Sequence, residues 1–206
     1  MSLVPAFEIG LWNAWVFMFY LNLFYFLPTL INKFNKGATR KREIFIRMSS
    51  DVSRSKAEKA CGFFSYGFFS WLIFFLLCIY SIFLPLQSGT KWFYIGLPIC
   101  LFGVITFTMV MVSFISTPLD KPITTGLYRY SRHPMYLTLF LIYLGISITT
   151  ASWIFLLWWL VYPIQVLSRI IYEERFCLKK YGKVYRQYMN TTPRWIGILK
   201  SRGSEQ

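Results

Sequence analysis

The chain has 206 residues, of which 56% are hydrophobic and only 15% are charged. Soluble domains carry roughly 25% charged residues, so this composition disfavours a soluble fold. The net charge is +14, which in a soluble protein would make nucleic acid a candidate partner. The composition instead predicts an integral membrane protein, and the placement of the basic residues described below disfavours a nucleic-acid role.

Apolar stretches follow one another along the chain and are long enough to cross a bilayer as helices, which takes about 20 residues. The last stretch, residues 135–171, exceeds one span and is interrupted near residues 149–152, so it is interpreted as two helices joined by a tight turn. We expect spans over residues 9–31, 60–86, 92–116, 135–148 and 152–171. No segment alternates with a period of two, as a β-barrel would require. The sequence therefore predicts an all-α integral membrane protein with about five transmembrane helices.

Lysine and arginine are unevenly distributed. Of the 22, all except Lys91 lie in residues 32–59, in residues 117–134 or from Arg169 onward. With five spans these segments lie on one side of the membrane, and the positive-inside rule makes that side cytoplasmic, with the N-terminus outside. The basic charge thus indicates orientation, and contact with anionic membrane lipids rather than with nucleic acid.

Small residues in the spans indicate packing rather than chemistry. Gly96, Gly103 and Gly145 lie inside predicted spans, where they would let helices approach closely. The 4 cysteines have no CxxC spacing, so neither a metal site nor a disulfide is expected. The whole chain, residues 1–206, is predicted to form a single domain.

The segment after the last span, EERFCLKKYGKVYRQY over residues 173–188, keeps helical spacing of its apolar residues. We expect the helix to continue beyond the membrane surface as a cytoplasmic C-terminal helix. Gly182 is its weak point, and residues 190–193 end it. Its tyrosines, Tyr181, Tyr185 and Tyr188, can serve as interfacial anchors or stack on a ring-shaped ligand.

The motif TGLYRYSRHPMY, residues 125–136, contains the only histidine of the chain. Pro134 suits the first turn of a helix, which places His133 at the N-cap of the fourth span. Free backbone N–H groups, the positive end of the helix dipole and Arg132 would together form an anion-binding corner. The alternative is a helix cap that contacts lipid phosphates.

Two adjacent acids, Glu173 and Glu174, follow the fifth span in an otherwise basic tail. Arg169 lies four residues before Glu173, so these two side chains share a helix face and can pair. Glu174 points about 100° away, toward another face. The acids can belong to a functional site, or the pair can be an ordinary surface ion pair.

The combination of GLYRYSRHPMY, EExxLxxxYGxxYxxY and TPRW, over residues 117–195, resembles the isoprenylcysteine carboxyl methyltransferase and phospholipid methyltransferase group of integral membrane enzymes. The resemblance implies S-adenosylmethionine as methyl donor, bound on the cytoplasmic side by the last two spans and the C-terminal helix. It also implies a lipophilic acceptor that enters from the bilayer. The Gly-rich motif of soluble dinucleotide-binding folds is absent from the sequence.

The resemblance also assigns residues. It places cofactor contacts at Asp120, Lys121, Pro122, Ile123, Tyr128, His133, Pro134, Met135, Tyr136 and Glu173, and it turns Arg169 toward the acceptor. Arg132 with His133 suits the carboxylate of the cofactor, and Glu173 suits its amino group or ribose hydroxyls. Prenylcysteine enzymes tend to carry histidine where this chain has Asp120, and this departure leaves open the acceptor or the exact cofactor contacts.

The acceptor decides whether a base is needed. Prenylcysteine carboxylate, the amine of phosphatidylethanolamine, an isoprenoid and a small thiol all remain candidates. A carboxylate would need no base, whereas an amine or thiol would need one, for which Glu173 or Glu174 is available. Arg169, Glu173 and Glu174 are therefore the predicted catalytic residues.

Two other functions compete with this interpretation. Membrane sterol-type reductases, which use NADPH, resemble the group in an RH-x-x-Y motif, but the RHP triplet and the EExxL run favour a methyltransferase. A non-enzymatic scaffold or transporter subunit is the second alternative. A transport path would place charges inside the spans, and the first three spans carry none.

Overall fold

The computed structural model describes residues 9–23, 69–118 and 121–197. Its helices are α4 (Phe69–Ile82), α5 (Lys91–Ser116), the 3₁₀ helix η2 (Gly126–Arg129), α6 (Pro134–Thr149), α7 (Trp153–Tyr181) and α8 (Lys183–Thr191). Residues 15–23 are also helical. Within these described ranges there is no strand, only an isolated bridge between Asn13 and Pro85. The prediction of an all-helical chain is confirmed for this part of the molecule.

Local sequence signals explain where the helices begin. The hydroxyl oxygens of Thr90 and Ser152 accept hydrogen bonds from the backbone N–H groups of Phe93 and Phe155, which caps α5 and α7. Pro134 occupies the first turn of α6, as predicted. The five helix boundaries from residue 91 to residue 153 lie within one residue of those predicted for the third, fourth and fifth spans.

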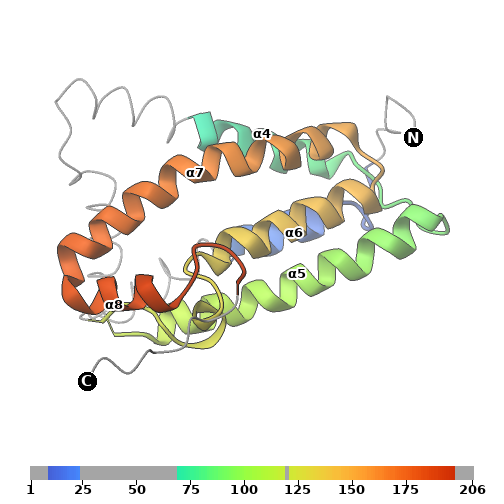
Figure 1. The fold of residues 1–206 in the computed structure, drawn as a ribbon. Helices are drawn as coiled ribbons and strands as arrows, with labels where there is room; N and C mark the ends of the chain where they lie inside the picture. Colours follow the sequence, from blue (N-terminus) through green and yellow to red (C-terminus); the bar gives the residue numbers. More distant parts are fainter. Residues whose placement is uncertain (1–8, 24–68, 119–120, 198–206) are drawn as a thin grey trace, which may run out of the picture.

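The helix that begins at Trp153 continues past its apolar part to Tyr181, as predicted. Gly182 then adopts a positive φ of 55°, a conformation that favours glycine, and α8 begins at the next residue. The weak point predicted at Gly182 is therefore a true break. Because of it, α8 folds back toward the start of α6 (Figure 1).

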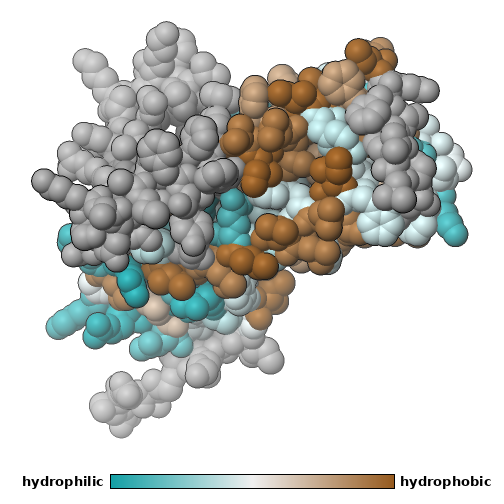
Figure 2. All heavy atoms as spheres, turned by 90° about the horizontal axis from the view of Figure 1, so that it is seen from above, coloured by the Kyte–Doolittle hydropathy of each residue, from teal (hydrophilic) through white to brown (hydrophobic). Residues whose placement is uncertain are grey.

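Two of the described helices, α5 and α7, are long and apolar enough to cross a membrane. Only 33% and 29% of the residues in their apolar stretches are buried, whereas the core helix of a soluble protein would be mostly buried. Hydrophobic side chains gather on the face shown in Figure 2. The predicted spans over residues 9–31 and 60–86 extend into residues outside the described ranges.

The helix α6 lies between α5 and α7 and packs tightly on α5 (Figure 1). Glycines allow this close approach, as predicted: Gly96 lies against the backbone of Thr149, and Gly145 lies against Cys100. Gly103 occupies the same interface. Without a hydrophobic driving force between helices in lipid, such small residues let the backbones make van der Waals contact.

Replacing Gly145 by alanine is expected to lower the free energy of unfolding by about 1–3 kcal/mol, the usual cost of overpacking. The added Cβ would lie 2.5 Å from the Cα of Cys100, so α5 and α6 would have to separate. Alanine favours a helix over glycine by about 1 kcal/mol, so the effect of propensity has the opposite sign. Thermal unfolding in detergent measures the balance, and a higher Tm would contradict the prediction.

Candidate functional site

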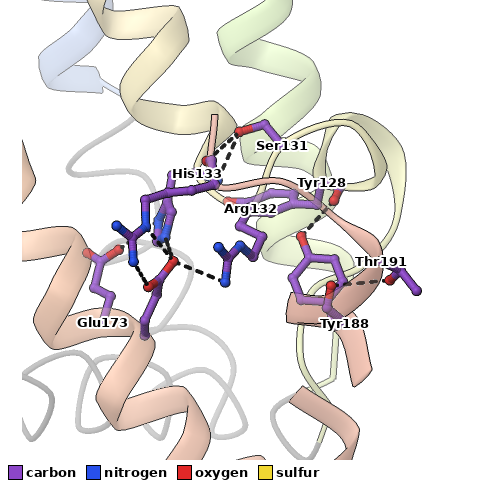
Figure 3. A network of polar contacts seen from close by, with 9 residues as sticks. Tyr128, Ser131, Arg132, His133, Glu173, Tyr188 and Thr191 are labelled. Carbon is purple, nitrogen blue, oxygen red and sulfur yellow. Dashed lines mark hydrogen bonds and ion pairs between the residues drawn. The ribbon is translucent and has the colours of Figure 1, made fainter. Parts of the chain in front are cut away.

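The candidate site lies where the start of α6 meets the C-terminal part of α7 (Figure 3). The start of α6 contributes Arg132 and His133, and α7 contributes Glu173 and Glu174. About forty residues separate the two pairs in sequence, yet their charged groups lie within ion-pair distance. The structure therefore brings together the two motifs that the sequence singled out.

His133 lies between the two acids. Its Nδ1 atom is 3.5 Å from Oε2 of Glu173, and its Nε2 atom is 3.3 Å from Oε1 of Glu174. The side chain is buried, and its backbone N–H donates to the hydroxyl oxygen of Ser131. His133 is the N-cap residue of α6, as predicted, but its ring turns toward the carboxylates instead of capping the helix. A protonated ring could donate to both acids.

Glu174 is the centre of this network. Arg194 approaches it with two groups: Nε donates to Oε1 over 3.1 Å, and Nη2 donates to Oε2 over 2.6 Å. The Nη1 atom of Arg132 lies 3.3 Å from Oε1 on another side. Only 6% of the Glu174 side chain is exposed. A buried carboxylate held by two arginines and a histidine is a structural anchor with its acceptor positions largely taken.

Glu173 is the more accessible acid, with 24% of its side chain exposed. The hydroxyl of Tyr136, one turn into α6, donates to its Oε1 atom. Because its Oε2 atom faces His133 at 3.5 Å, the carboxylate has a fixed orientation. Glu173 thus combines fixed orientation with access to a ligand.

The guanidinium group of Arg132 has N–H groups without a hydrogen-bond acceptor among the described residues. Its side chain is 10% exposed, and its Nε and Nη1 atoms are buried without a hydrogen-bond partner among the described residues. The Nη1 atom is near Glu174 but outside hydrogen-bond geometry. Buried donors of this kind usually have a partner, and an anionic ligand group would supply one.

The segment after α8 folds over this corner. The backbone N–H of Arg132 donates to the carbonyl oxygen of Pro193 over 3.0 Å, and the Ser131 hydroxyl donates to the carbonyl oxygen of Arg194 over 3.2 Å. Further along, the Tyr188 hydroxyl donates to the carbonyl oxygen of Tyr128 over 2.6 Å. Burial raises the pKa of Tyr188, so this hydroxyl keeps its proton at neutral pH.

Residues 89–184 match the phospholipid methyltransferase family model.

The family match confirms the resemblance predicted from the motifs. It covers α5, α6, α7 and the four residues at which α6 meets α7. Arg194 lies beyond it. No curated protein and no solved structure is significantly similar to the chain.

The remaining predicted cofactor contacts are residues 120–123, 128, 134 and 135. Lys121 is exposed, Pro122 and Ile123 are half-buried, and all three precede η2. Tyr128 and Pro134 are buried, and Met135 packs against the core. Asp120 lies outside the described residues. The described ranges contain no group of three or more His, Cys, Asp or Glu side chains that could hold a metal ion.

Arg169 is half-buried one helical turn before Glu173. Its predicted pairing with Glu173 stays a prediction. The predicted site did not include Arg194 or Ser131. The sequence signal that points to Arg194 is the TPRW motif, residues 192–195.

Proposed function

We propose that the chain is a single-domain integral membrane methyltransferase that transfers a methyl group from S-adenosylmethionine to a lipophilic acceptor from the bilayer. The proposal includes about five transmembrane helices, a site on the cytoplasmic side and an N-terminus outside. One observation supports it above all: the family-matched helices α6 and α7 bring Arg132, His133 and Glu173 together in one oriented cluster.

The residues of the cluster fit this cofactor. S-adenosylmethionine is a zwitterion, and the unpaired donors of Arg132 suit its carboxylate. The fixed, partly exposed carboxylate of Glu173 suits its ammonium group or ribose hydroxyls. The aromatic rings of Tyr128 and Tyr136 border the same corner, and Lys121, Pro122, Ile123, Pro134 and Met135 are proposed as further contacts, together with Asp120. When bound, the cofactor supplies an electrophilic methyl group.

The chain itself contributes mainly positioning. Displacement of a methyl group needs in-line alignment more than covalent help, so rigid binding and exclusion of water can supply much of the rate. In this proposal, His133 and Tyr136 hold the carboxylate of Glu173 in its orientation. Glu174 in turn holds the ring of His133. Glu174 is therefore proposed as a positioning residue.

In this proposal, Arg169 is the residue that contacts the acceptor. Its half-buried cation can orient an acidic or phosphate-bearing acceptor at the end of the apolar part of α7. If the acceptor is an amine or a thiol, Glu173 is the better base, because the acceptor positions of Glu174 are largely taken.

Calorimetric titration of the detergent-purified protein with S-adenosylhomocysteine, and separately with NADPH, tests the function. We expect saturable binding of S-adenosylhomocysteine alone. Binding of NADPH alone would support a reductase instead. If folded protein binds neither ligand, the family match would describe ancestry, and a scaffold role would replace the proposed activity.

A further inference from the structure

The apolar part of α7 buries a hydroxyl that packing does not explain. Tyr162 is only 7% exposed, and its hydroxyl has no hydrogen-bond partner among the described residues. Its ring packs edge-on against Tyr143 of α6, with 5.2 Å between the ring centroids. A phenylalanine would make the same ring contacts, so the oxygen atom of Tyr162 is the feature that needs a reason.

An unpaired hydroxyl is costly at this position. A buried polar group without a partner destabilises a fold, and the hydrocarbon core of a membrane offers no water to replace the missing partner. Buried tyrosine hydroxyls usually find a hydrogen-bond partner for this reason. A hydroxyl that has none in the ligand-free protein is therefore a candidate for binding a ligand.

The hydroxyl of Tyr162 belongs to the same side of α7 as the candidate site. At about 100° per residue, Arg169 and Glu173 lie within about 20° of the direction of Tyr162 on the helix. Across from this side of α7, the Tyr136 hydroxyl of α6 donates to Glu173, and the Tyr143 ring of α6 packs on Tyr162. Polar groups thus continue from the site into the apolar region between α6 and α7.

Two further donors lie one turn before Tyr162. The indole N–H groups of Trp158 and Trp159 are buried without a hydrogen-bond partner among the described residues. The Trp158 ring packs edge-on against Tyr143 of α6, with ring centroids 6.1 Å apart. Trp159 stacks on Phe140 of α6, with ring centroids 4.8 Å apart. An indole N–H can only donate, so a ligand that satisfies this region must bring acceptor oxygens.

We propose that Tyr162 is a positioning and specificity residue for the lipid acceptor. Its hydroxyl donates a hydrogen bond to an oxygen atom of a lipid that inserts between α6 and α7, and Trp158 and Trp159 provide further donors. The site therefore favours a lipid that carries hydrogen-bond-accepting oxygen over a bare hydrocarbon chain. This inference rests on the proposed methyltransferase function.

The test compares the parent protein with Tyr162→Phe, which removes only the hydroxyl. Both proteins receive radiolabelled S-adenosylmethionine and vesicles of a total membrane lipid extract, and the initial rate of label transfer into lipid is measured at sub-saturating lipid. One hydrogen bond is worth about 2- to 10-fold in rate, so we expect the rate for Tyr162→Phe to be lower by this factor. The Kd of S-adenosylhomocysteine should stay unchanged.

A stability measurement separates this role from a structural one. Removing an unsatisfied buried hydroxyl should raise the Tm of the ligand-free protein, by about 2–4 °C for each kcal/mol gained in a chain of this size. A structural hydroxyl would instead lower the Tm when removed. Tyr94→Phe is the matched control, because Tyr94 is exposed on α5, and it should change neither the rate nor the Tm.

Each outcome decides one of the two proposals. If Tyr162→Phe transfers label as fast as the parent, or binds S-adenosylhomocysteine more weakly, the role of Tyr162 is overturned while the methyltransferase function stands. The role of Tyr162 is also overturned if Tyr162→Phe lowers both the Tm and the rate, because the hydroxyl would then be structural. If the parent binds S-adenosylhomocysteine but labels no lipid, the lipid acceptor of the proposed function is wrong, and the role of Tyr162 falls with it.

Discussion

Replacing Glu174 by glutamine is expected to destabilise the protein more than any other substitution in the candidate site. The change removes one negative charge and leaves Arg132 buried without its ion-pair partner, beside His133. Breaking a buried ion pair by removing one partner typically costs about 3–5 kcal/mol. For a chain of this size, that cost corresponds to a loss of roughly 6–20 °C in Tm. Thermal unfolding in detergent is the measurement.

The partner Arg194 provides the control. Its side chain is 42% exposed, so Arg194→Gln removes a cation that water can largely replace, and it leaves Glu174 paired with Arg132. We expect a loss of only about 1 kcal/mol from this variant. The double variant should cost less than the sum of the two single changes, because the pair is then already broken. Additive effects would show that Glu174 is not the centre of the network.

The helices from α5 onward could be predicted because their signals are local. Thr90 and Ser152 cap their own helices, and Pro134 fixes the first turn of α6. Gly182 breaks the last long helix because it adopts a positive φ. Each of these signals acts within one helical turn, so the sequence alone contains it. The lengths of the apolar stretches indicated the remaining helix boundaries, since the thickness of a bilayer determines how long a spanning helix must be.

The candidate site was only partly predictable, because its contacts are tertiary. Spacing on one helix indicates that Glu173 and Glu174 point in different directions, but it does not indicate what each acid meets. Arg194 reaches Glu174 only because α8 folds back at Gly182 and returns the chain to the start of α6. The same chain reversal brings the carbonyl oxygen of Arg194 within hydrogen-bond distance of the Ser131 hydroxyl. No periodic pattern in the sequence predicts that the chain after Gly182 comes back to the start of α6.

Replacing Glu173 by glutamine is expected to weaken binding of S-adenosylhomocysteine by about 10- to 100-fold while leaving the fold intact. The side-chain oxygen of glutamine can still accept the hydrogen bond from Tyr136, so the contact between α6 and α7 is kept. The loss is the negative charge, which in the proposed site faces the ammonium group or ribose hydroxyls of the ligand. A hydrogen bond to a charged group is worth about 1.5–3 kcal/mol, which gives this range of affinity.

Tyr136→Phe separates the charge of Glu173 from its orientation. This variant keeps the carboxylate and its approach to His133 but removes the hydroxyl that holds Oε1. We expect a loss of affinity of about tenfold or less, because the ligand must then fix a more mobile carboxylate. Calorimetric titration of both variants, with unchanged Tm for Glu173→Gln, measures the two effects. If Glu173→Gln binds S-adenosylhomocysteine as tightly as the parent, Glu173 does not contact the cofactor, whatever the reaction.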